Sequence, residues 1–154
     1  MKRILASGLF ALILSAPAAL AQVQSLETGP LTVASGNGSH AFTVELADDP
    51  EEITIGLMNR DSLAPDAGMI FDFGQPREAS MWMKNTLIPL DMLFIDAKGK
   101  VVAIARNTVP GSLRTINPGV PVKSVLELAG GRTAELGIEP GDTVHHEIFG
   151  NSQG

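Results

Sequence analysis

Chemically active side chains crowd one short segment, Ser80 to Met92. It holds the only tryptophan, Trp82, together with a lysine and an aspartate, Lys84 and Asp91, among apolar residues. A polar group in apolar surroundings is costly to bury unless it has a hydrogen-bonding or charged partner. The segment therefore indicates either a buried structural network or a binding site.

Strand periodicity assigns the aromatic and the basic residue to one face. If residues 78–84 form a strand, Trp82 and Lys84 point to the same side, and an aromatic surface lies beside an ammonium group. Such a surface suits a cleft for a polar ligand. Packing of Trp82 on the aliphatic stem of Lys84 at the rim of the core would produce the same pattern without a ligand. Both interpretations remain open.

Asp91 is the residue most in need of a partner. It lies in the run 90–96, which is apolar on both faces, so we expect a central strand. A carboxylate in a central strand stays charged only beside a cation or several hydrogen-bond donors. The candidate cations are Lys84 and Arg60, and Asn85 and Thr86 are candidate neutral donors.

Glu127 poses the same problem in another expected strand, 122–128. If Asp91 and Glu127 approached each other, the two carboxyl groups would form a pair capable of acid–base catalysis, as in glycoside hydrolysis. The sequence leaves open whether they meet, and therefore whether the protein is an enzyme.

No metal site or cofactor is expected. The chain has no cysteine, and the adjacent His145 and His146 would point to opposite faces of a strand, far from His40 in the sequence. Core packing explains the methionines better than soft-metal binding does. Neither a phosphate-binding glycine loop nor a nucleophile elbow is present.

The first residues have the pattern of an export signal. Lys2 and Arg3 precede a short apolar run, and Ala19-Leu20-Ala21 supplies the small residues of a cleavage site. We expect residues 1–21 to be removed and the protein to lie in the periplasm or outside the cell, with no membrane span. Removal would take two of the 11 basic residues and none of the 17 acidic ones, leaving a net charge of −8. An acidic chain of this kind disfavours nucleic acid as a partner.

The remaining chain indicates one β-rich domain, 31–150, preceded by a flexible leader, 22–30. Apolar alternation predicts strands at 31–34, 41–46, 68–73, 78–84, 90–96, 100–106, 122–128 and 143–149. Asp49 as cap and Pro50 at the first helical position predict a short helix that ends near Met58 to Arg60, and one helical turn is expected at 133–136. The expected fold is mainly β, an antiparallel β-sandwich or barrel with one or two short helices.

Taken together, these motifs resemble a prokaryotic domain-of-unknown-function family, number 192. The matching segments, in order, are 56–60, 68–71, 82–91, 94–96, 126–130 and 141–142. The resemblance implies a compact, mostly β domain that is often exported, and it supplies no established activity. The family commonly has an aromatic residue shortly before its Leu-Glu pair, whereas this chain has Val122 to Val125 there and no tyrosine at all.

Three hypotheses follow. The first is an exported β-domain that binds a small polar ligand, a saccharide or peptide fragment of the cell envelope, through Arg60, Trp82, Lys84, Asn85 and Asp91. The second is an envelope hydrolase that uses Asp91 and Glu127. The third is a structural or protein-interaction module, in which the polar network is buried and an envelope protein binds an exposed edge strand.

Overall fold

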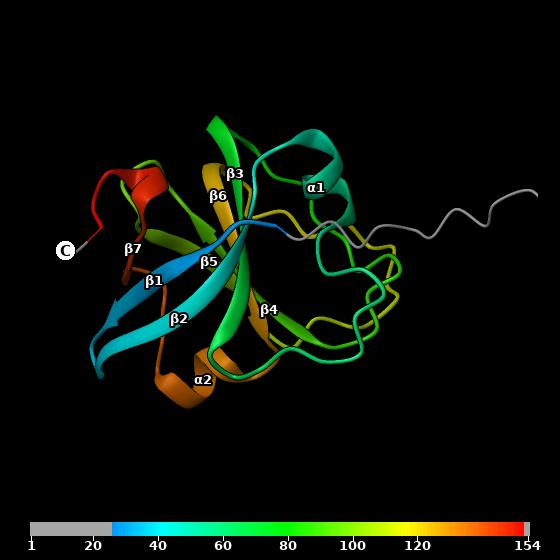
Figure 1. The fold of residues 1–154 in the computed structure, drawn as a ribbon, viewed down its shortest axis with the longest axis horizontal. Helices are drawn as coiled ribbons and strands as arrows, with labels where there is room; N and C mark the ends of the chain where they lie inside the picture. The colour runs from blue at the N-terminus through cyan, green and yellow to red at the C-terminus, as the bar shows by residue number, and fades with distance from the viewer. Residues whose placement is uncertain (1–25, 153–154) are drawn as a thin grey trace, which may run out of the picture.

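The computed structural model describes residues 26–152, which form one seven-stranded sheet that curls into a half-barrel (Figure 1). The strands are β1 (Thr28–Ser35), β2 (Gly38–Ala47), β3 (Ala67–Glu78), β4 (Leu90–Ile95), β5 (Val101–Ala105), β6 (Pro121–Ala129) and β7 (Thr143–His145). The helices are α1 (Pro50–Ile55), α2 (Arg132–Leu136) and the 3₁₀ turn η1 (Glu147–Phe149). The expected mainly β class with two short helices is confirmed.

The strands lie in the order β5-β4-β6-β3-β2-β1-β7. All neighbouring pairs are antiparallel except β2 and β3. A parallel pair needs a crossover connection, and here α1 and the following loop supply it. The crossover therefore places α1 over one face of the sheet.

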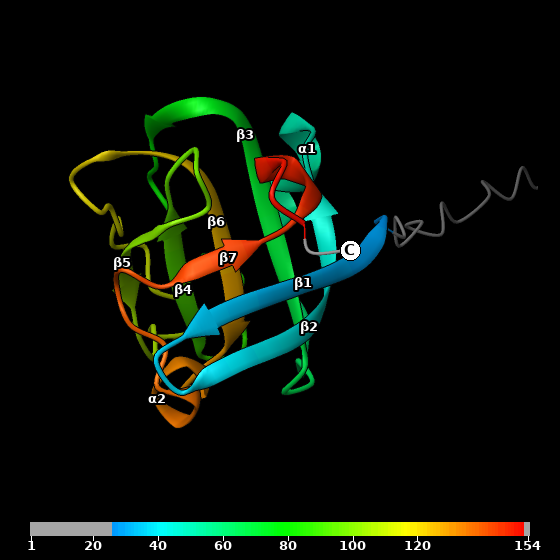
Figure 2. The same ribbon diagram turned by 90° about the vertical axis from the view of Figure 1, so that its left-hand side faces the viewer.

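The two edges of the sheet meet. An isolated antiparallel bridge joins Lys100, just before β5, to Thr143 at the start of β7. Beside it, the N–H of Val144 donates to the carbonyl of Gly99 at 2.7 Å. Figure 2 shows β7 lying between β1 and the β4–β5 hairpin. These contacts satisfy backbone groups that an open edge would leave unpaired.

Alternation along the strands gives the sheet two apolar faces. The inner cluster takes residues from all seven strands and fills the curl: Leu31, Val33, Phe42, Val44, Ile70, Leu93, Ile95, Val101, Leu126, Leu128, Ile138 and Val144. The outer cluster consists of Ala47, Leu57, Met69, Phe71, Ala79, Met83, Leu90, Met92, Phe94, Val122 and Val125. The outer cluster includes residues of the segments after α1 and after β3, which therefore cover this face.

The sequence signal for the first helix is confirmed. Asp49 caps α1, because its Oδ1 accepts the N–H groups of Glu51 and Glu52 at 2.8 and 2.9 Å. The helix ends at Ile55, earlier than expected, because Gly56 takes a positive φ of 49° and leaves the helical conformation.

Other expected boundaries were also wrong. Strand β1 begins at Thr28, inside the expected leader, because it pairs with β2 along its whole length. Residues 79–89 form a loop rather than a strand, in which only Met81 makes a β-bridge, to Ile116. The last expected strand stops at His145, after which the chain turns into η1.

The expected signal peptide, 1–21, and the first part of the leader lie outside the described residues. Within residues 26–152, each helix is too short to cross a membrane.

The approach of β3 to β6 yields a test of the packing. A Cβ at Gly68 would lie 2.7 Å from the carbonyl oxygen of Glu127 and 2.9 Å from Cδ2 of Leu128. Gly68→Ala should therefore lower the free energy of unfolding by about 1–3 kcal/mol, as measured by urea denaturation. Gly29→Ala in β1, where a Cβ meets nothing within 4 Å, is the matched control. Equal effects of the two substitutions would contradict the close approach.

Candidate functional site

Asp91 is completely buried on β4 and is bound by four hydrogen-bond donors. Its Oδ1 accepts the N–H groups of Asn107 and Gly131 at 2.8 and 3.0 Å. Its Oδ2 accepts the N–H and the hydroxyl of Thr133 at 2.8 and 2.6 Å. Burial by itself raises the pKa of Asp91, but these bonds outweigh it and hold the pKa below its usual value. Asp91 therefore stays ionised without an ion pair.

The Asp91 carboxylate caps helix α2 from the neighbouring strand. Gly131, the N-cap residue, has no side chain with which to bind the free N–H groups at the helix start. Asp91 supplies the missing acceptor, and its negative charge complements the positive end of the helix. The close contact also requires glycine at 130, where a Cβ would lie 2.9 Å from Cβ of Pro89. Asp91 thus anchors α2 against the sheet.

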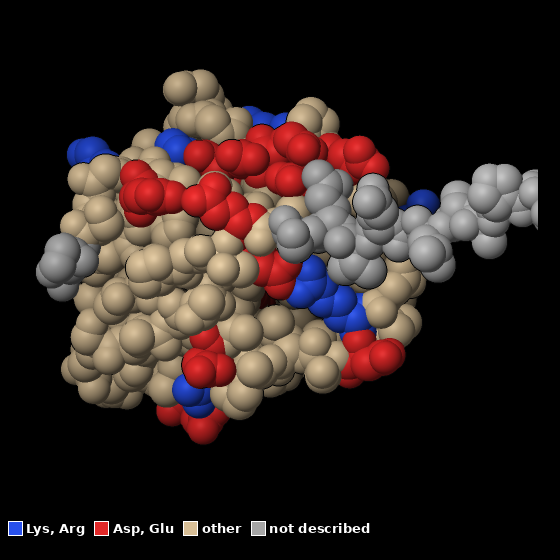
Figure 3. Space-filling model, in the orientation of Figure 1, with Lys and Arg blue, Asp and Glu red and all other residues tan. Residues whose placement is uncertain are grey.

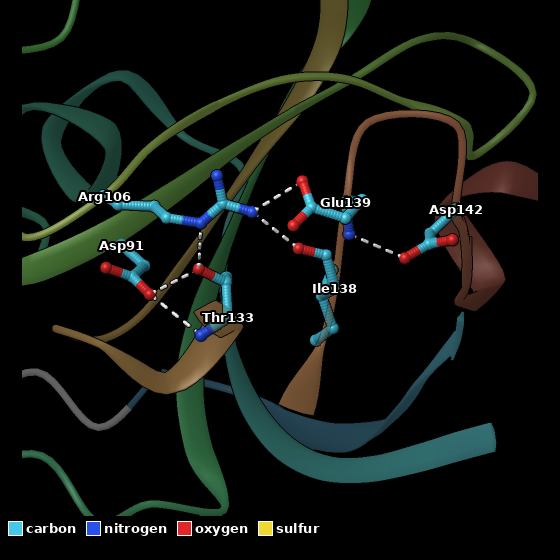
Figure 4. A network of polar contacts seen from close by, with 6 residues as sticks. All are labelled: Asp91, Arg106, Thr133, Ile138, Glu139 and Asp142. Atoms are coloured by element: carbon cyan, nitrogen blue, oxygen red, sulfur yellow. Dashed lines mark hydrogen bonds and ion pairs between the residues drawn. The ribbon is translucent and has the colours of Figure 1, made fainter. Parts of the chain in front are cut away.

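Arg106 extends this network toward β7 (Figure 4). Its Nε donates to the Thr133 hydroxyl at 3.1 Å, and its Nη2 donates to the carbonyl of Ile138 at 2.8 Å. The same Nη2 lies 2.9 Å from Oε2 of Glu139. The network therefore joins the end of β5 to the segment that leads into β7, and its role is structural.

The partners expected for Asp91 lie elsewhere. Arg60 forms a two-point ion pair with Glu45 of β2, and this hydrogen bonding raises the pKa of Arg60. Lys84 lies in the 79–89 loop, with Nζ 5.1 Å from the ring centroid of Trp82. The expectation that Arg60 or Lys84 would balance Asp91 was wrong, because backbone donors from distant segments satisfy this carboxylate.

Asn85 and Thr86, the expected neutral donors to Asp91, also make other contacts. Asn85 takes a positive φ of 54°, and its carbonyl accepts the N–H of Asn59 at 2.8 Å. The Thr86 hydroxyl donates to the carbonyl of Lys84 at 3.2 Å. Asn85 and Asn59 thus hold the loop after α1 against the 79–89 loop.

Asp91 and Glu127 point to opposite faces of the sheet. In the register of β4 and β6, Asp91 pairs with Leu128 and Glu127 pairs with Met92. Leu128 belongs to the inner cluster and Met92 to the outer cluster. Directly paired residues of neighbouring strands share a face. The two carboxyl groups therefore do not face one cleft, and the expected acid–base pair is not formed.

Glu127 instead lines a small recess on the outer face, which we call the Glu127 recess. Its side chain is 4% exposed, and no described residue bonds to its carboxyl group. Burial raises the pKa of Glu127 to about 8, so the group is protonated at neutral pH. The recess has a volume of about 30 Å³ and is otherwise lined mainly by apolar side chains of α1, β3 and the 79–89 loop. It has room for one water-sized group.

A larger depression of about 230 Å³ adjoins the recess; we call it the Trp82 groove. Its lining is Ile53, Thr54, Phe73, Arg77, Ser80, Met81 and Trp82. It shares Trp82 and three other lining residues with the recess, so the two lie side by side. Trp82 is 44% exposed. The guanidinium of Arg77 lies 4.1 Å from the ring centroid of Phe73.

The structure thus brings Trp82, Glu127 and Arg77 to one site, with Lys84 beside Trp82. Sequence reasoning missed Arg77, because it lies beyond a register shift in β3 between Asp72 and Arg77 that alternation does not reveal. No group of His, Asp or Glu side chains in residues 26–152 is arranged to hold a metal ion.

Comparison with known proteins identifies a family for this chain. Residues 32–146 match the DUF192 family, described as Uncharacterized ACR. The chain belongs to the DUF192 family. The family suspected from the Trp82–Asp91 run is thereby confirmed, and both the inner network and the Glu127 recess lie within the matched region.

Two solved structures are similar to this DUF192 domain. One, from Sinorhizobium meliloti 1021, is described as a candidate transcription regulator; it is 45% identical, has a TM-score of 0.79, and the match covers 80% of this chain and 97% of that chain. The other, a protein of unknown function from Novosphingobium aromaticivorans DSM 12444, is 39% identical with a TM-score of 0.79, covering 91% and 100%. A search of curated proteins gives no match.

The inner network yields a test in the DUF192 domain. Asp91→Asn replaces one acceptor oxygen with an amide that cannot accept hydrogen bonds, so the free energy of unfolding at pH 7 should fall by about 2–3 kcal/mol. Because the pKa of Asp91 is lower in the folded state, its stabilisation is present above pH 3.8 and is lost as the pH falls through the folded value. Urea denaturation between pH 2 and 7 measures both effects. The exposed Asp61→Asn is the control, and an equally small effect of both would contradict the capping role.

Glu127 should make stability depend on pH in the opposite direction to Asp91. The folded-state pKa of Glu127, about 8, lies above the ordinary value of 4.5, so folding favours the protonated form. The free energy of unfolding should therefore fall as the pH rises from 4.5 to 8, by an amount of the order of 4 kcal/mol. Glu127→Gln should remove this slope and be the more stable protein at pH 8. Glu135→Gln on α2, where the side chain is 68% exposed, should leave the slope unchanged. A slope that persists in Glu127→Gln would contradict the assignment.

Proposed function

We propose that this DUF192 domain binds a small polar ligand in the Trp82 groove and inserts one polar group of that ligand into the Glu127 recess. The observation that carries the proposal is that the Glu127 carboxyl, 4% exposed, has no bonding partner among residues 26–152. An unpaired buried polar group costs about 1–3 kcal/mol. A ligand that supplied the missing partner would recover this free energy.

The surroundings of Glu127 support the proposal. Ligand sites typically combine apolar and aromatic walls with a few convergent polar groups. The groove offers Trp82, an aromatic surface open to solvent, while the recess offers one carboxyl group. Arg60, expected to bind the ligand, is instead paired with Glu45, and the Asn85 side chain contacts the sulfur of Met58, with Nδ2 3.9 Å from Sδ. We therefore assign the site to Trp82 and Glu127, with Lys84 and Arg77 beside them.

The ligand class follows from the expected location. The export pattern of residues 1–21 supports a place in the periplasm or outside the cell, where saccharide and peptide fragments of the envelope are available. Aromatic rings stack on the apolar faces of sugars, and a neutral carboxyl group both donates and accepts hydrogen bonds. We propose such a fragment as the ligand.

Two other functions are less well supported. A hydrolase based on Asp91 and Glu127 would need both carboxyl groups in one cleft, and they point to opposite faces. The description of the S. meliloti relative suggests regulation of transcription, but this chain carries a net charge of −6. Figure 3 shows an acidic band over the edge that carries α1, which would repel nucleic acid.

The tryptophan provides a direct test. Trp82 is the only tryptophan and the chain has no tyrosine, so intrinsic fluorescence reports on the groove. The probes are N-acetylglucosamine, D-glucose, D-glucosamine and the dipeptides Ala-Ala and Lys-Ala. At least one should change the emission saturably, and Glu127→Leu should weaken its binding about tenfold or more because the leucine removes the hydrogen bond.

Glu135→Gln is the matched control, because α2 and α1 lie at opposite ends of the molecule (Figure 1). It should bind like the wild type. Failure of every probe to change the emission, or equal binding by Glu127→Leu and the wild type, would contradict the proposal.

A further inference from the structure

The polar group that enters the Glu127 recess is, we infer, a primary ammonium group, with Glu127 as its counter-ion. This inference rests on the proposed function and names the chemistry of the ligand. It does not depend on whether the amine belongs to a sugar or to a peptide, since both sources present the same –NH3⁺ group.

The size of the recess favours a small group. A volume of about 30 Å³ holds one water-sized group, and an ammonium head has this size. The recess adjoins the larger groove, so the rest of the ligand lies along Trp82. A larger group, such as a guanidinium or an acetamide, would not fit without movement of α1.

The charges around the recess leave Glu127 available for a ligand cation. The charged residues on the elements around the recess are Glu45 on β2, Glu51 and Glu52 on α1, Asp72, Arg77 and Glu78 on β3, Lys123 on β6, Arg60 after α1 and Lys84 in the 79–89 loop. None of them bonds to Glu127. Arg60 is neutralised by Glu45, and Asp72 is bound by Lys123. No cation of the described chain competes for the carboxyl group.

The walls of the site attract a cation as well. Tryptophan is the best aromatic partner for an ammonium group, and Lys84, with Nζ 5.1 Å from the Trp82 ring centroid, already takes this position, so Glu127 is the remaining counter-ion for a ligand ammonium. The acidic band over α1 raises the local concentration of cations near the groove (Figure 3). Arg77, at the Phe73 side of the groove, repels the ammonium and so directs it to the recess end.

Binding would change the protonation state of Glu127. In the free protein its pKa of about 8 keeps the carboxyl protonated near neutral pH. An ammonium group beside it favours the carboxylate. The balance is R–NH3⁺ plus Glu127–COOH giving the R–NH3⁺ and Glu127–COO⁻ pair and one proton, which passes to the buffer. A neutral hydroxyl in the same place would release no proton.

Isothermal titration calorimetry of the full-length protein at pH 6.5 tests this inference. D-glucosamine against D-glucose tests the sugar source. Nα-acetyl-Lys-Ala against Nα-acetyl-norleucyl-Ala tests the peptide source, because the acetyl caps remove the α-ammonium from both peptides and leave only the lysine amine. The amine of at least one pair should bind about tenfold or more tightly than its matched partner. Titration in buffers of different ionisation enthalpy should show release of about one proton per bound amine.

The variants separate the possible results. Glu127→Gln keeps the shape of the recess but should lose both the amine preference and the proton release, while its circular dichroism stays that of a folded protein. Glu135→Gln should retain both. Equal binding of amine and matched partner without proton release would overturn the ammonium assignment and leave the proposed function standing. Absence of binding by all four probes would overturn the ammonium assignment, and the proposed function would be overturned as well only if all the fluorescence probes also failed.

Discussion

The pleat of β4 and β6 is the constraint on which both buried carboxyl groups depend. These strands are neighbours, yet alternation sends Asp91 toward the inner face and Glu127 toward the outer face. At Asp91, the N–H groups at the start of α2 converge on the carboxylate and keep it ionised. At Glu127, the recess is lined mainly by apolar side chains of α1, of the residues just after it, of β3 and of the 79–89 loop, and burial keeps the carboxyl protonated. Two acidic residues on adjacent strands thus differ in charge at neutral pH, because Asp91 is ionised and Glu127 is protonated.

The two faces also divide stability from the proposed function. The Asp91 network ties α2 and, through Arg106, the entry to β7 to the sheet, so it supports the closure of the half-barrel. On the other face, α1 has only six residues and none of them is fully buried. The helix that covers the Glu127 recess is therefore held mainly by the Asp49 cap and by packing of the chain that follows it. A well-packed sheet beneath a short, partly exposed helix suits a site that a ligand must enter.

The long signature run of the DUF192 family is explained by this division. Trp82 forms a wall of the groove, whereas its neighbour Met83 is fully buried in the outer cluster. Pro89 contacts the chain at Gly130, and Asp91 caps α2. The run therefore combines a solvent-facing aromatic residue with residues that hold the loop and the sheet together. Its specificity as a motif comes largely from structural requirements, and its ligand chemistry is contributed by Trp82 together with a residue outside the run, Glu127.

Local patterns in the sequence determined the β-rich class, the Asp49 cap of α1 and the strands β4 and β5, because caps and alternation depend on neighbouring residues. They also identified Asp91 and Glu127 as buried acids that need an explanation. Only the tertiary structure decided their partners, because Asn107, Gly131 and Thr133 reach Asp91 from segments far along the chain. The register of β4 and β6 separated the acids, and the packing of α1 over β6 formed the recess. Register and cavities arise from contacts between distant segments, which local periodicity does not contain.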